Sequence, residues 1–105
     1  MKPYYKENGI QIFHGDCREI APTLFFICAI ADPPYGETSL EWDRWVKDWP
    51  RYLLSSTNER TLWCFGSMRM FLNKIDEFHP WKFAQDLVWE KHNGSGFQAD
   101  RFKRV

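Results

Sequence analysis

The sequence predicts an α/β fold, a layered structure with a largely parallel sheet. Short apolar stretches typical of strands alternate along the chain with stretches in which apolar residues recur at helical spacing. The 105 residues are 44% hydrophobic and 27% charged, which is an ordinary composition for one small globular domain. We therefore expect residues 1–105 to form a single domain.

The amino-terminal stretch predicts a strand followed by a helix. Ile10–Phe13 alternates apolar and polar residues, which is the pattern of a short strand with one buried face. A helical stretch then runs from Cys17 to about Leu24. Asp16 and Glu19 have the spacing of a capping box, in which Asp16 accepts hydrogen bonds from the amides of the first turn.

The longest apolar run, Leu24–Ala31, predicts a central strand covered on both faces, because parallel strands are buried between layers of helices. This run stops at Asp32–Gly36, a segment with two prolines that can neither continue a strand nor start a helix directly. We therefore expect these five residues at the carboxyl end of the central strand, where open α/β sheets bind their ligands.

The second half predicts two amphipathic helices and two more strands. Apolar residues at helical spacing indicate a helix over residues 42–53, with a kink at Pro50. Residues 62–65 have the pattern of a short buried strand. Residues 68–78 indicate a second amphipathic helix, and residues 83–89 indicate another strand.

Charge is balanced overall but uneven along the chain. Residues 1–90 carry ten basic and thirteen acidic side chains, whereas residues 91–105 carry four basic and one acidic. The segment after residue 90 therefore predicts a basic loop, which suits either nucleic acid or simple solvation. The residues of this tail that could meet phosphates are Lys91, Arg101, Lys103 and Arg104.

The three cysteines, Cys17, Cys28 and Cys64, are odd in number and contain no Cys-x-x-Cys pair. This favours reduced thiols in a cytosol over a disulfide framework or a zinc site, and the scattered histidines predict no metal centre. No apolar run reaches the roughly 18 residues of a spanning helix, and Met1–Tyr5 lacks the apolar core of a signal peptide. We therefore expect a cytoplasmic protein that does not cross a membrane.

Each residue of the segment Asp32–Gly36 has a usable chemical property. Asp32 offers a carboxylate, while Pro33 and Pro34 have no N–H, so the segment presents carbonyl acceptors without competing donors. Tyr35 offers a flat face for stacking, and Gly36 allows close approach. Together they suit a planar ring bearing an exocyclic amine. The alternative is a rigid turn in which Asp32 only caps the next segment.

Asp32–Tyr35 resembles the Asp-Pro-Pro-Tyr motif of the amino-group DNA methyltransferases, which methylate adenine N6 or cytosine N4 with S-adenosylmethionine. Ile10–Cys17 resembles the opening strand and Gly-Asp turn of the members that place the catalytic motif first. Leu62–Ser67 and Val88–Asn93 resemble the next core strand and the Trp-x-Lys segment. The resemblance implies an incomplete Rossmann-like methyltransferase fold with three layers and a mainly parallel sheet.

The resemblance also implies residue roles, with Asp32, Pro33, Pro34 and Tyr35 as the catalytic set. Tyr35 would stack on a base flipped out of the duplex. Asp32 and the Pro33 carbonyl would bind its amine and stabilise positive charge during methyl transfer, whether or not Asp32 takes the proton. Asp16 resembles the acidic residue that, like Asp32, contacts the cofactor, and a plain helix cap is its alternative. An initial Asp rather than Ser favours adenine N6.

The family's Phe-x-Gly-x-Gly cofactor turn is absent from the 105 residues, so the S-adenosylmethionine pocket is expected to be incomplete. The chain then resembles the amino-terminal half of a methyltransferase, as in a truncated gene, a prophage remnant or a split enzyme. We expect it to be inactive alone and to need a complementing carboxyl-terminal half to act on DNA. Nine Phe, six Trp and four Tyr also predict a homo-oligomer that buries excess aromatic surface. The alternative is a non-enzymatic remnant, or a self-associating or DNA-binding module.

Overall fold

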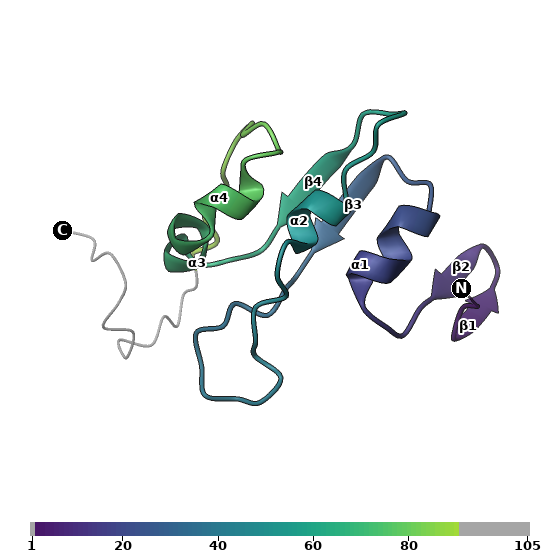
Figure 1. Cartoon of the computed structure of the whole chain (residues 1–105), viewed down its shortest axis with the longest axis horizontal. Coiled ribbons are helices and arrows are strands. Elements are labelled where there is room, and N and C mark those ends of the chain that lie inside the picture. The colour runs from purple at the N-terminus through teal and green to yellow at the C-terminus, as the bar shows by residue number, and fades with distance from the viewer. Residues whose placement is uncertain (1, 91–105) are drawn as a thin grey trace.

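The computed structural model describes residues 2–90 as a mixed α/β chain with two small sheets. Strands β1 (Tyr5–Glu7) and β2 (Ile10–Ile12) form a hairpin, and strands β3 (Cys28–Ala31) and β4 (Thr61–Cys64) pair in parallel (Figure 1). The helical segments are α1 (Cys17–Ile20), the 3₁₀ turn η1 (Ala21–Thr23), α2 (Trp49–Tyr52), α3 (Met68–Asn73) and α4 (Ile75–Phe78). The α/β class and the parallel pairing of the two apolar stretches are confirmed.

The strand expected at residues 10–13 forms as β2, but the prediction of a buried face is wrong. Ile10 and Ile12 are 59% and 48% exposed, because within residues 2–90 β2 pairs with β1 and with no other strand. Asn8 and Gly9 link these two strands with φ angles of 52° and 80°. A type I′ hairpin turn requires positive φ at both central residues, and Asn-Gly is its usual sequence.

The predicted helix after residue 16 begins with the expected cap. The Asp16 carboxylate accepts a hydrogen bond from the Arg18 amide at 2.9 Å. The α-helical turns end at Ile20, and the chain tightens into η1, which has Pro22 in its first turn. Proline lacks the N–H that a continuing α-helix would use, so the last turn becomes 3₁₀.

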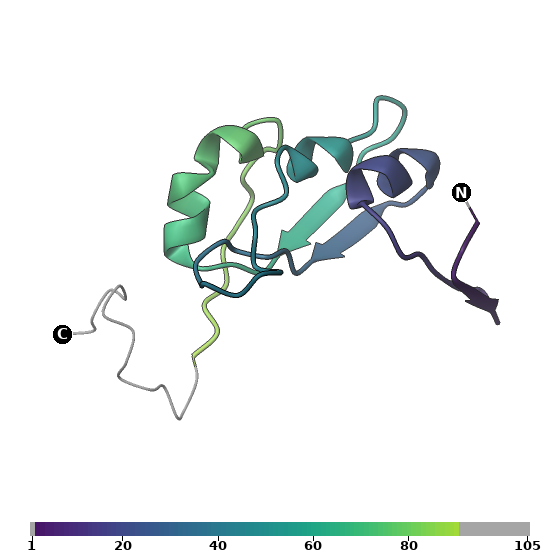
Figure 2. The same ribbon diagram turned by 60° about the horizontal axis from the view of Figure 1, so that its bottom comes forward.

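The central strand is shorter and more open than predicted. Only Cys28–Ala31 of the apolar run is strand, because the Leu24 and Phe26 carbonyls accept hydrogen bonds from the Arg60 and Asn58 side chains. α1 and α2 lie over one face of the β3–β4 sheet (Figure 2). On the other face Ile30 is 73% exposed, so the prediction of a strand covered on both faces is wrong within residues 2–90.

Three predictions in the second half need correction. The helix expected over residues 42–53 is confined to α2, because Asp48 has a left-handed φ of 64° and Pro50 lies in the first helical turn rather than at a kink. The helix expected over residues 68–78 is divided at Lys74 into α3 and α4. Residues 83–89 form neither helix nor strand.

The core is small and lies beneath the helices. Trp49 is 3% exposed, and its ring packs against Trp45 and Phe78 at centroid distances of 6.0 and 5.7 Å. Trp42, the first residue of the helix expected over residues 42–53, is 70% exposed. The other buried apolar residues of the described range are Ile20, Ala21, Pro50 and Met70. This cluster anchors the loop between β3 and α2, which carries the predicted site. No helix in residues 2–90 has the length and apolar character needed to span a bilayer.

Candidate functional site

The predicted motif leaves the carboxyl end of β3 directly, since Asp32 follows the last strand residue. The Asp32 side chain is exposed, and its carboxylate forms no hydrogen bond or ion pair with any other residue of the described range 2–90. A turn-forming or capping aspartate would accept hydrogen bonds from nearby amides. The geometry therefore leaves both carboxylate oxygens available to an external donor.

The Asp32 carboxylate acts electrostatically on two neighbours. Burial raises the pKa of Tyr35, and the negative charge of Asp32 raises it further. Burial also raises the pKa of the Cys64 thiol to about 12, again with a contribution from Asp32. Ala31 is the last residue of β3, and Cys64 is the last residue of β4. Because the two strands pair in parallel, their carboxyl ends lie at the same edge of the sheet. The predicted position of Asp32 at the carboxyl edge of the sheet is confirmed.

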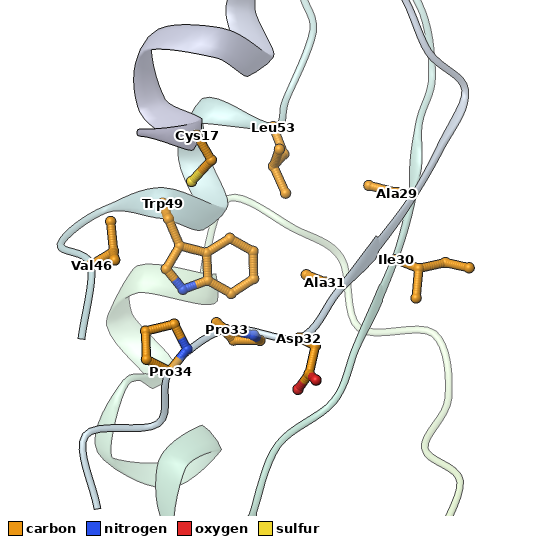
Figure 3. A pocket seen from close by; sticks show the side chains of 10 residues that line it. All are labelled: Cys17, Ala29, Ile30, Ala31, Asp32, Pro33, Pro34, Val46, Trp49 and Leu53. Carbon is orange, nitrogen blue, oxygen red and sulfur yellow. The ribbon is translucent and has the colours of Figure 1, made fainter. Parts of the chain in front are cut away.

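Asp32, Pro33 and Pro34 line one side of an apolar cavity of about 300 Å³ (Figure 3). Ala29 and Ala31 face the ring of Trp49 across this cavity, whereas the oxygens of Asp32 point away from that ring. The other lining residues are Cys17, Ile30, Val46, Trp49 and Leu53. The cavity therefore offers apolar contact, with one carboxylate at its margin.

These residues alone do not fit S-adenosylmethionine. Asp32 is the one charged residue that lines the cavity, and the buried Trp49 Nε1 has no hydrogen-bond partner within residues 2–90. An amino-acid carboxylate and a ribose need several donors and acceptors, which apolar walls do not supply. The described part of the chain could hold an apolar ring in this cavity, but not the remainder of the cofactor.

Asp16, the second predicted cofactor contact, is already engaged. Its two oxygens accept from Arg18 Nε and Nη2, the shortest contact being 2.6 Å. Hydrogen bonds from the side chain and amide of Arg18 lower the pKa of Asp16 to about 2. The helix-cap alternative therefore describes the observed geometry, and a contact between Asp16 and a cofactor stays a prediction.

Asp43 organises the loop that follows the motif, and sequence reasoning missed it. Its carboxylate accepts from the amides of Gly36, Glu37 and Thr38 at 2.8, 3.1 and 2.8 Å, and from the Thr38 hydroxyl at 2.7 Å. Asp43 is only 4% exposed, and these hydrogen bonds, led by that from the Thr38 side chain, lower its pKa to about 2. Gly36 has a φ of 73°, which disfavours other residues at this bend. In the sequence, the only indication of this role is that Asp43 is an acidic residue a few positions after the turn that contains Gly36.

Two further carboxylates attach this loop to the helices. Glu37 Oε1 accepts from the hydroxyl of Ser67, the N-cap of α3, at 2.6 Å. Glu77 in α4 accepts from the Trp45 indole N–H at 2.9 Å and from the Asp48 amide at 2.6 Å. The segment after Tyr35 is thus tied to both α3 and α4, which restricts where the tyrosine ring can lie.

Tyr35 and Gly36 line a second cavity of about 670 Å³, which is largely polar. The motif therefore separates two hollows, an apolar one beside Asp32–Pro34 and a polar one beside Tyr35. The other residues around the polar cavity are Glu37, Asp43, Arg44, Trp45, Arg69, Met70, Asn73 and Lys74.

The remaining predicted site residues are the four basic residues of the carboxyl-terminal tail. Lys91, Arg101, Lys103 and Arg104 lie outside the described residues. Between residues 2 and 90, no group of three or more His, Cys, Asp or Glu side chains is placed to hold a metal ion. No family model, curated protein or solved structure matches this chain.

Proposed function

We propose that this chain supplies the catalytic-motif part of an S-adenosylmethionine-dependent DNA methyltransferase acting on adenine N6. The observation that carries the proposal is the exposed carboxylate of Asp32, which has no partner in residues 2–90 and lies at the carboxyl end of a parallel strand. Tyr35 follows three residues later and is half-buried beside it. The proposal includes an incomplete Rossmann-like fold and a cytoplasmic location.

In this function the motif residues bind and orient the target amine. Asp32 and the Pro33 carbonyl each accept one N–H of the exocyclic amino group, and Tyr35 stacks on the base. Two acceptors held out of the ring plane favour a more tetrahedral nitrogen, whose lone pair is then less delocalised into the ring. They also stabilise the positive charge that develops on the nitrogen. Pro34 fixes the spacing between the two acceptors, on Asp32 and Pro33, and the ring of Tyr35.

The cofactor is proposed to be held mainly by a complementing polypeptide, since the described cavity does not fit it. Within residues 2–90, the edge of β3 that faces away from β4 pairs with no other strand, which supports this arrangement. The Ile27 carbonyl accepts a hydrogen bond from the amide of Thr61 in β4, and the Ala31 carbonyl accepts one from the amide of Phe65, which follows β4. Successive residues of a strand direct their backbone N–H and C=O groups to alternate edges. Those of Cys28 and Ile30 therefore point to the edge of β3 that faces away from β4. A strand from a second chain could pair there and extend the sheet.

A self-associating, non-enzymatic module is the second candidate, and the open sheet favours it. Ile30, Trp63 and Phe65 are 73%, 42% and 50% exposed on one face. Residues 24–31 carry no charge and no proline, the features that normally protect an edge strand from pairing. Two copies could therefore cover this surface in a homo-oligomer, with the motif acting only as a turn.

The test is transfer of tritiated methyl groups from S-adenosylmethionine to unmethylated DNA, with and without a second polypeptide that carries the Phe-x-Gly-x-Gly turn. Incorporation that requires the second polypeptide and disappears in Asp32→Ala supports the methyltransferase. Asp76→Ala, a change at an exposed position of α4, is the matched control and should retain activity. Absence of incorporation under every complementation, together with a dimer by light scattering, favours the self-associating module.

A further inference from the structure

Three basic residues from separate segments surround the polar cavity beside Tyr35. Arg44 lies in the loop after the motif, Arg69 lies on α3, and Lys74 lies at the junction of α3 and α4. Asn73 adds a side-chain amide to the same wall. The fold therefore gathers donors that are up to 30 positions apart in the sequence, from Arg44 to Lys74.

The two acidic residues of the wall are already engaged in holding the loop. Asp43 accepts four hydrogen bonds from residues 36–38. Glu37 accepts from Ser67 and lies 4.0 Å from Arg69 Nε. The negative charge of Asp43 is thus partly compensated by donors of the loop, and that of Glu37 by Ser67 and Arg69 at the start of α3. The cavity wall holds three basic and two acidic side chains.

The cations are also positioned by their surroundings. Arg44 Nη1 donates to the Leu40 carbonyl at 3.1 Å, which holds one side of the guanidinium against the loop. Lys74 Nζ lies 5.2 Å from the centroid of the Trp45 ring, a cation–π contact. Partial ordering of long side chains lowers the entropy cost of binding an anion.

We propose that this cavity binds a backbone phosphate of the DNA strand that presents its base to Tyr35. This inference rests on the proposed function, because it takes the stacking role of Tyr35 as its starting point. Arginine and lysine together with an amide are the donor set that proteins use on phosphodiester oxygens. Such contacts fix the register of a strand without reading its sequence.

The inference is tested by binding of the full chain to a short fluorescein-labelled DNA duplex, followed by anisotropy at several salt concentrations without S-adenosylmethionine. Arg44→Gln and Lys74→Gln should each weaken binding by roughly 3- to 10-fold at physiological salt and reduce the slope of log affinity against log salt by about 1. Lys47→Gln, an exposed change in the same loop but outside the cavity wall, is the matched control and should leave both quantities unchanged.

The outcomes separate this inference from the proposed function. Equal effects of Lys47→Gln and Lys74→Gln would overturn the phosphate site, as would unchanged binding by both cavity variants. Loss of binding in the cavity variants, with no methyl transfer under any complementation, would uphold the phosphate site while the methyltransferase proposal fails.

Discussion

Replacing Asp43 by asparagine should destabilise the loop that carries Tyr35. Asparagine has one carbonyl oxygen, so its best orientation keeps the three hydrogen bonds from Glu37 and Thr38 and turns the NH₂ group toward the Gly36 amide, which now lies 2.8 Å from the carboxylate. Loss of a single hydrogen bond to a buried charged group should raise the ratio of unfolded to folded chain by roughly 10- to 100-fold.

The assay is urea unfolding of the full chain at neutral pH, followed by tryptophan fluorescence. Trp45 and Trp49 lie beside this loop and report its unfolding. Asp76→Asn, at an exposed position on α4, is the matched control and should unfold at the wild-type urea concentration. If Asp43→Asn also unfolds at that concentration, the hydrogen bonds of Asp43 do not hold the loop and the reasoning is refuted.

The same variant predicts a pH dependence with a definite sign. The folded-state pKa of Asp43 is lowered from its ordinary value of 3.8 to about 2. The ionised carboxylate therefore contributes its full stabilisation above about pH 4 and loses it as the pH falls through about 2. The stability difference between wild type and Asp43→Asn should stay constant from neutral pH to about pH 4 and then shrink. Asp16 titrates in the same range, but it is present in both proteins and cancels in the difference.

Changes at three other positions have expected outcomes. In a complemented enzyme, Tyr35→Phe should keep most of the activity, measured as kcat/KM. Tyr35→Ala should lower kcat/KM by an amount equivalent to about 1–3 kcal/mol of stacking energy. An equal loss of activity in both variants would refute the stacking role. Asp32→Asn should lower methyl transfer at least tenfold with little change in melting temperature, because the side chain is exposed; a sharp fall in melting temperature would favour the turn interpretation. Gly66→Ala should destabilise the chain by about 1–3 kcal/mol in urea unfolding. Its Cβ would clash with Met70 Cε and lie 2.8 Å from the Phe71 ring, and Met70 is only 2% exposed; a more stable variant would contradict this packing.

Features that depend on a few neighbouring residues could be predicted from the sequence. The apolar run before Asp32 predicts a strand, and the two prolines after it predict its end. Asp16 was expected as a helix cap because its side chain needs only the amides of the next turn. The β1–β2 hairpin is equally local, because Asn8 and Gly9 both accept the positive φ angles that its turn needs.

Features that depend on distant partners could not be predicted in this way. Residues 24–27 have the composition of a strand, yet Asn58 and Arg60 reach their carbonyls from more than 30 positions away. Glu77 of α4 similarly fixes Trp45, a loop residue 32 positions earlier in the sequence. A side-chain donor can satisfy a carbonyl as well as a neighbouring strand can, so the choice between them depends on which groups packing brings together.

The candidate site combines both kinds of information. The chemistry of Asp32–Tyr35 is local, because it follows from residue types and from the end of one strand. The environment of the motif is not local, because Asp43, Arg69 and Lys74 reach it only through the folding of the loop and of α3 onto it. A sequence pattern reports backbone preference over a few residues, whereas burial and charge around a side chain depend on every segment that packs against it.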